Sequence, residues 1–280
     1  MLRKGDLTQG GITTTLLQFT LPMLAGSLLQ QCYNIADTLI VGQCIGANAL
    51  AAVGSAYTLM VFLISILLGL SMGSGTVFSL QYGAEDLSAL RRSIYVSLLL
   101  IGTVTILLNV AVFLWLDPIL RWLQVPYDIY SLMRNYLWII FWGIVFTFLY
   151  NFYAALLRAV GDSVTPLWFL AVSVVLNIGL DLFLILVLDQ GIEGAAVATV
   201  IAQGTAASGI LLYTYKTRPE LRLHREDMCF DRSSLREITS FSTLTCVQQS
   251  VMNFGILMVQ GLVNSFGTVV MACLLYTSPS

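Results

Sequence analysis

Residues 165–188 read TPLWFLAVSVVLNIGLDLFLILVL, and Asp181 is the only ionisable side chain among them. About 20 apolar residues are enough for an α-helix to cross the hydrocarbon core of a bilayer, because each residue adds about 1.5 Å. A strand of a membrane barrel would instead show about 10 residues of alternating pattern. This stretch therefore predicts a transmembrane helix.

Apolar blocks of similar length lie on both sides of this stretch and are separated by charged residues. We expect further spans at 15–42, 52–82, 93–115, 131–157, 193–215 and 238–264, with an eighth that begins near Thr268. The 280-residue chain is 58% hydrophobic and 10% charged, whereas a soluble domain carries about 25% charged residues. The sequence thus predicts an all-α integral membrane protein embedded in a lipid bilayer.

The basic residues indicate an orientation. With the N-terminus in the cytoplasm, only Arg121 and Arg134 of the 13 Lys and Arg residues fall on the outer side, as the enrichment of basic residues in cytoplasmic loops predicts. The charges at 216–236 mix both signs, and we interpret this segment as a solvated linker rather than a patch for anionic lipid or nucleic acid. We expect a multi-pass plasma-membrane protein with a cytoplasmic N-terminus and no nucleic-acid partner.

Residues for catalysis are scarce. The five cysteines are scattered without a C-x-x-C pair, and the only histidine is His224, in the charged stretch. A zinc site needs several Cys or His ligands close together, and a Ser-His-Asp triad would have to use this one histidine of the charged stretch. We therefore expect no enzymatic activity, no cofactor and no metal other than Na⁺. An intramembrane aspartyl protease is the remaining enzyme hypothesis.

A weak internal repeat divides the chain. Residues 19–21 (FTL) are echoed by 241–243 (FST), and 45–51 by 266–272, at an offset of about 221 residues. Six spans separate the two copies, so both run in the same direction, as in transporters with parallel repeats. We expect a six-helix lobe at 1–215, the linker at 216–236 and the start of a second lobe at 237–280.

The repeat also bears on the length of the chain. Two full copies need about 440 residues, so we expect one lobe and a fragment of the second, with 238–264 as the last complete span. From about Cys273 the sequence reads CLLYTSPS, which does not continue an apolar span. We interpret this tail as non-native.

Two acidic residues lie inside predicted spans, Asp37 and Asp181. A charge in the bilayer costs about 3 kcal/mol or more, so such residues indicate a functional site. Each lies roughly 10 Å below the outer surface, at 1.5 Å per residue; Asn177 shares the helix face of Asp181, and Thr199 lies about 8 Å deep on the next span. These four side chains predict a hard-oxygen site for Na⁺ or H⁺. The alternative is that each acid only hydrogen-bonds a neighbouring helix.

Other polar residues support weaker hypotheses. Five side chains are candidates for lining a cavity or contacting substrate: Gln30, Gln31, Tyr33, Asn34 and Tyr150. The alternative is that the first four join helices by hydrogen bonds and that Tyr150 faces lipid or core. Pro22 removes a backbone hydrogen bond within its span and allows a bend, so we consider it a hinge.

Four motifs, in order, resemble the multidrug and toxic compound extrusion (MATE) family. They are LP-x₁₄-D-x₃-VG-x₂-IG-x₂-ALAA at 21–52, RAVGDSVTP at 158–166, N-x₃-D at 177–181 and GAAVAT at 194–199. The resemblance covers residues from about 8 to 272.

The resemblance implies a twelve-helix antiporter with two six-helix lobes, of which this chain would hold the N-terminal lobe and the start of the other. Such proteins export cationic, amphipathic drugs in exchange for Na⁺ or H⁺, and the matching cation-site positions are Asp37, Asn177, Asp181 and Thr199. We expect a monomer when full length. The alternatives are a flippase for lipid-linked oligosaccharides, disfavoured because no Lys or Arg lies mid-span, and a non-functional transporter fragment.

Overall fold

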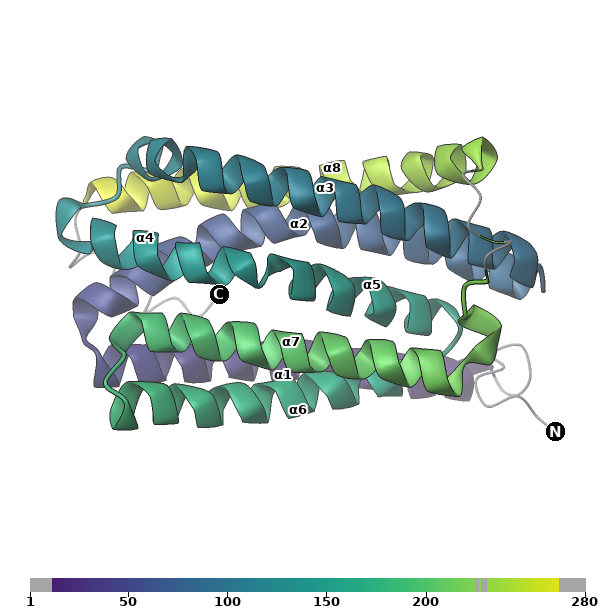
Figure 1. Cartoon of the computed structure of the whole chain (residues 1–280), viewed down its shortest axis with the longest axis horizontal. Helices are drawn as coiled ribbons and strands as arrows, with labels where there is room; N and C mark the ends of the chain where they lie inside the picture. Colours follow the sequence, from purple (N-terminus) through teal and green to yellow (C-terminus); the bar gives the residue numbers. More distant parts are fainter. Residues whose placement is uncertain (1–11, 225–226, 228–230, 267–280) are drawn as a thin grey trace.

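The computed structural model describes residues 12–224, 227 and 231–266, and the part of the chain that it describes contains helices and no strand. Figure 1 shows an elongated bundle whose helices run side by side along one axis. The predicted all-α class is therefore confirmed. The eighth span expected near Thr268 and the tail from Cys273 lie outside the described residues.

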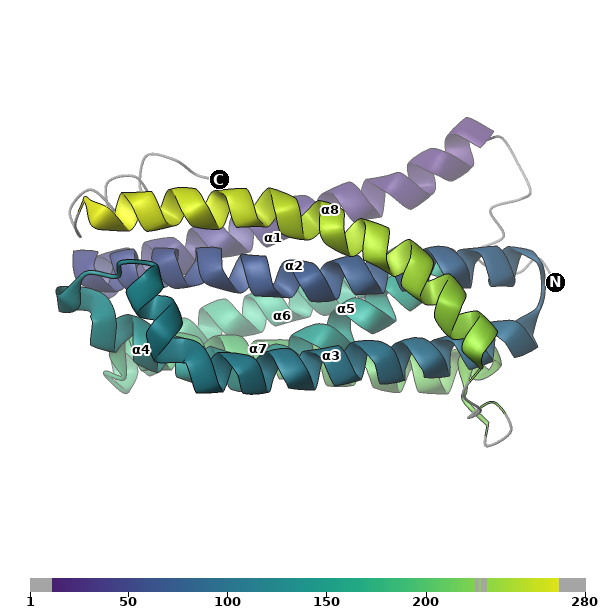
Figure 2. The same ribbon diagram turned by 90° about the horizontal axis from the view of Figure 1, so that it is seen from above.

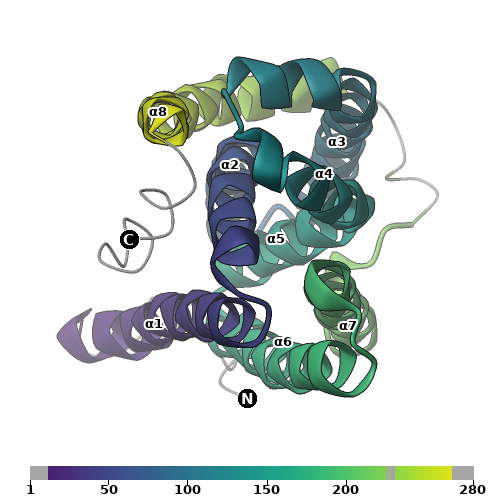
Figure 3. The ribbon, with the colours of Figure 1, turned by 90° about the vertical axis from the view of Figure 1, so that its left-hand side faces the viewer.

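Long helices fill the bundle. In chain order the elements are α1 (Ile12–Cys44), α2 (Ala47–Gly83), α3 (Leu87–Trp122), α4 (Tyr127–Trp142), α5 (Ile144–Ala159), α6 (Val164–Leu182), the π-helical turn η1 (Phe183–Val187), α7 (Gly191–Thr217), the 3₁₀ turn η2 (Pro219–Leu221) and α8 (Arg232–Ser265). Among the described residues, five helices are long and apolar enough to cross a membrane, and the bent pair α4–α5 makes a sixth. The remaining helix, α1, has 33 residues and runs beside α6 (Figure 3) but does not reach that apolar length, so its crossing of the membrane stays a prediction.

The span expected at 131–157 is present but broken. Its two halves, α4 and α5, are bent by 48° about Gly143. The Gly143 N–H donates to the Ile140 carbonyl at 2.8 Å, a tighter turn than the α-helical one. A Cβ atom at Gly143 would lie 2.8 Å from Val200 Cγ2 of α7. Glycine therefore lets α7 pack directly against the break.

The helices extend beyond the apolar blocks that predicted them. The third span, expected at 93–115, begins at Leu87 because the Asp86 carboxylate accepts the Ala89 N–H at 2.9 Å, which caps the helix. It then continues past a non-helical Trp115 to Trp122. Capping chemistry, rather than hydrophobicity, sets this boundary.

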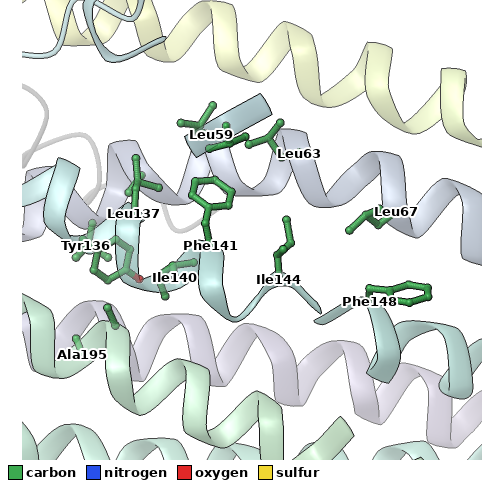
Figure 4. Close-up of a cluster of buried hydrophobic side chains, with 14 of the residues drawn as sticks. Leu59, Leu63, Leu67, Tyr136, Leu137, Ile140, Phe141, Ile144, Phe148 and Ala195 are labelled. Carbon is green, nitrogen blue, oxygen red and sulfur yellow. The ribbon is translucent and has the colours of Figure 1, made fainter. Parts of the chain in front are cut away.

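Helix α2 lies at the centre of the bundle. Leu59, Leu63 and Leu67 are spaced four residues apart, so they share one face, and all three are buried. Figure 4 shows that face packed against α4 and α5, where Phe141 and Phe148 are among the side chains that meet it. This packing fixes the broken span against α2.

Helix α8 packs on another side of α2 (Figure 2). A Cβ atom at Gly69 would lie 2.4 Å from Cys246 Cα, and one at Gly73 would lie 2.3 Å from Ser242 Cα. Such close approach of two backbones needs residues without a side chain. The Ser242 hydroxyl also donates to the Leu70 carbonyl at 3.1 Å.

The predicted linker at 216–236 is shorter in the structure, because α7 continues to Thr217 and α8 begins at Arg232. Two ion pairs tie its described residues to the bundle. Arg91 Nε lies 3.0 Å from Asp227 Oδ2, and Arg218 lies 3.4 Å from the Asp162 carboxylate. These residues are thus held against the start of α3 and against the loop between α5 and α6.

Candidate cation site

Helix α6 carries the first part of the candidate site. Asn177 and Asp181 lie one helical turn apart, so both face the same way, and they are 1% and 0% exposed. Directly after Leu182 the helix widens into η1, in which the Leu188 N–H bonds the Phe183 carbonyl at 3.2 Å. Such π-helical turns occur frequently at functional sites.

The second acid comes from α1. The carboxyl groups of Asp37 and Asp181 lie close enough to interact with each other. The Oδ1 atom of each is buried and has no hydrogen-bond partner among the described residues. Two carboxylates this close repel each other unless a proton or a cation lies between them, so the pair fits a cationic guest.

Asn177 and Thr199 complete the set. With its amide nitrogen turned toward Asp181, Asn177 donates to Oδ2 at 3.0 Å and accepts the Thr199 backbone N–H at 3.3 Å. In the opposite orientation its Nδ2 lies 3.4 Å from Thr199 Oγ1. The structure therefore brings the four predicted residues together, from α1, α6 and α7. That they bind a cation stays a prediction.

Two tyrosines adjoin these residues. Tyr33 Oη lies 3.4 Å from Thr199 Oγ1. Tyr136 of α4 is buried and close enough to Asp37 and Asp181 to interact with their charges, and Figure 4 shows it on the α7 side of α4, near Ala195.

The sequence reasoning missed Tyr136. The depth estimate used for the acids would have found it, because Tyr136 lies about 8 Å from the outer end of the span that begins at 131.

The structure does not bring all of the other predicted cavity residues to the acids. Asn34 donates to Tyr57 Oη at 3.1 Å and to Gln31 Oε1 at 3.2 Å, which joins α1 to α2 near the acids. Gln30 is exposed on α1. Tyr150 is not brought to the acids, since its hydroxyl donates to the carbonyl of Pro166, about 22 Å along α6 from Asp181.

Pro22, the predicted hinge, lies inside α1. Figure 2 shows α1 bending away from the rest of the bundle toward its N-terminal end. Whether this bend moves during function stays a prediction.

Comparison with known proteins identifies the family. The sequence profile named MatE matches residues 22–183, more than half of the chain. The chain belongs to the MatE family. The probable multidrug resistance protein YpnP of Bacillus subtilis is 34% identical over 262 residues, which is 94% of this chain and 58% of YpnP. The multidrug export protein MepA of Staphylococcus aureus is 32% identical over 209 residues, 72% of this chain and 45% of MepA.

The chain thus spans about half the length of these MATE relatives. Among solved structures, a MOP superfamily transporter from Pyrococcus furiosus superposes with a TM-score of 0.85 at 23% identity, over 91% of this chain and 57% of that one. At this identity the likeness shows the fold, which is that of a MATE transporter. The sequence-based assignment to this family is confirmed.

Proposed function

We propose that this chain is part of a secondary antiporter that exports amphipathic, often cationic, compounds across the plasma membrane in exchange for Na⁺ or H⁺. The coupling cation binds at Asp37, Asn177, Asp181 and Thr199. The closeness of the Asp37 and Asp181 carboxyl groups, each with a buried Oδ1 atom that has no partner among the described residues, carries this proposal. MATE relatives named for multidrug resistance and multidrug export support the substrate class.

The donor set determines what the site can hold. Carboxylate, amide and hydroxyl oxygens are hard ligands of the type that Na⁺ prefers, and a carboxyl pair also accepts one proton. Because a charge buried away from water costs several kcal/mol, binding one cation relieves much of the cost of keeping two acids together. Loading and unloading of this site is therefore a step to which a conformational change can be coupled.

The arrangement of the whole transporter follows from the repeat. Residues 1–215 form one lobe with a cytoplasmic N-terminus, 216–236 connect the lobes, and 237–280 begin the second. Alternating access then comes from movement of one lobe against the other. A flippase for lipid-linked oligosaccharides is less well supported, because no basic side chain of the described residues contacts the acid pair.

Cation binding is testable on the 280-residue chain itself. The purified chain in lipid nanodiscs is titrated with radioactive sodium at several pH values, and proton release is followed in parallel. We expect saturable binding that Asp181→Asn abolishes. Asp189→Asn, which alters an exposed acid in the loop after η1, is the matched control and should bind normally. Equal Na⁺ binding and proton release in the parent and Asp181→Asn would reject the site.

A further inference from the structure

A narrow pocket adjoins the acid site on its inner side. It lies between α2, the broken span α4–α5, and α7. Three of its lining residues are polar, namely Thr147, Thr199 and Gln203, and the others are apolar: Met60, Ile64, Ile140, Phe141, Ile144 and Val200. Thr199 thus belongs both to the candidate cation site and to this pocket.

The pocket is too small for a drug. Its free space fits about one water molecule. A cavity of this size stays empty when its walls are wholly apolar, whereas a water molecule occupies it when two to four polar groups can bond it. The three polar residues meet that requirement.

The polar groups of the pocket follow one another along it. Gln203 follows Thr199 by one turn of α7, about 6 Å along the helix. The Thr147 hydroxyl donates to Gln203 Oε1 and also lies 3.4 Å from the Gly143 carbonyl at the break. Among the described residues this is the only hydrogen bond recorded for the Gln203 side chain, which leaves the other end of its amide for a guest in the pocket.

The pocket lies at the break between α4 and α5, with Ile140 and Phe141 before the break and Ile144 and Thr147 after it. Phe141, just before the break, has its carbonyl bonded by Asn109 Nδ2 of α3 at 2.9 Å, so the bent backbone is held from outside the span. The Asn109 Oδ1 atom is buried without a partner among the described residues. The polar groups therefore extend from Thr199 to the break at Gly143. A helical membrane protein tolerates such non-helical backbone where it lines a cavity.

We propose that a single bound water molecule occupies this pocket, held by Thr199, Gln203 and Thr147, and that it links the acid site to the break between α4 and α5. Its role in the antiporter rests on the proposed function: the coupling ion, Na⁺ or H⁺, takes its first step from the acids toward the cytoplasmic side by way of this water. Occupancy of the pocket by water does not depend on that role.

Radiolytic hydroxyl-radical labelling tests the occupancy. The 280-residue chain in nanodiscs, equilibrated in water enriched in heavy oxygen, receives a brief X-ray pulse, and oxidised residues are read by mass spectrometry. A bound water generates radicals in place, so the pocket residue Met60 should be labelled. Met133, which is 0% exposed and lies outside the pocket, should remain unlabelled.

Two variants make the result specific. Gln203→Leu and the shape-conserving Thr147→Val each remove a polar contact, so we expect Met60 labelling to fall by about threefold or more. Thr205→Val, which alters an exposed hydroxyl bonded to its own helix, is the control and should label as the parent does. Unchanged Met60 labelling in both pocket variants, or none in the parent, would overturn the inference. If Met60 labelling falls in Gln203→Leu while neither Na⁺ binding nor proton release differs between the parent and Asp181→Asn, the proposed function is contradicted and the water site stands.

Discussion

The hydroxyl oxygens of Tyr33 and Thr199 lie 3.4 Å apart although 166 residues separate them in the chain. The contact joins α1 to α7 beside the acid pair, while Asn177 joins α6 to α7. The candidate site is therefore complete only while α1, α6 and α7 are packed together. A movement of α1 would change the surroundings of both acids at once.

Thr199→Val should weaken cation binding. The substitution keeps the shape of the side chain but removes the hydroxyl that faces Tyr33 and Asn177. Loss of one buried polar contact costs about 1–3 kcal/mol, so we expect the Na⁺ dissociation constant to rise about tenfold in a nanodisc titration. Thr205→Val should leave it unchanged, and a Thr199→Val chain with parental affinity would remove Thr199 from the site.

Gly73→Ala should separate α8 from α2. The new Cβ would lie 2.3 Å from Ser242 Cα, and overpacking of this kind costs about 1–3 kcal/mol. We expect a lower thermal unfolding temperature of the chain in detergent. Gly255→Ala, on α8 at a position with nothing within 4 Å of the added Cβ, should match the parent. Equal losses in both variants would show that general helix effects, rather than the α2–α8 contact, are being measured.

The attachment of the linker should persist at neutral pH and be lost in acid. Burial opposes ionisation of Asp227, but hydrogen bonds from the His224 backbone N–H and from Arg91 outweigh it and lower the pKa of Asp227 below its ordinary value. A lowered folded pKa gives a contribution that is present above the unfolded value of about 3.9 and is lost as the pH falls through the folded pKa.

Hydrogen exchange of residues 218–224, corrected for the intrinsic effect of pH, checks this. We expect protection to be constant from neutral pH to about pH 5 and to fall below about pH 4. Arg91→Gln should lower the protection already at neutral pH. A transition near neutral pH in the parent would contradict the assignment to Asp227.

Composition and depth in the membrane were sufficient to predict most of the helices and most of the candidate site. Hydrophobic blocks placed the helices, and counting residues from the ends of spans put Asp37, Asp181 and Thr199 at one level. Both arguments use distance along the membrane normal, which can be counted from the sequence because each helical residue adds about 1.5 Å. The N-x₃-D spacing on one helix face correctly placed Asn177 beside Asp181.

The features that were missed depend on how helices rotate and neighbour each other. The break occurs at Gly143, where α7 packs directly against it, and a single glycine in an apolar span does not by itself predict a bend. The pairing of Thr147 with Gln203 needs α5 to lie beside α7, and Tyr136 joins the acids because α4 lies beside α7. Hydrophobicity does not specify these contacts, since lipid and a neighbouring helix are equally apolar surroundings.

Coupling by the acid pair is tested most directly by dye export in membrane vesicles by a full-length transporter that carries these residues, with a Na⁺ or an H⁺ gradient imposed one at a time. We predict export under at least one gradient, loss of that export in both Asp37→Asn and Asp181→Asn, and normal export in Asp189→Asn. Undiminished export by either Asp37→Asn or Asp181→Asn would contradict the assignment of this acid pair as the coupling site.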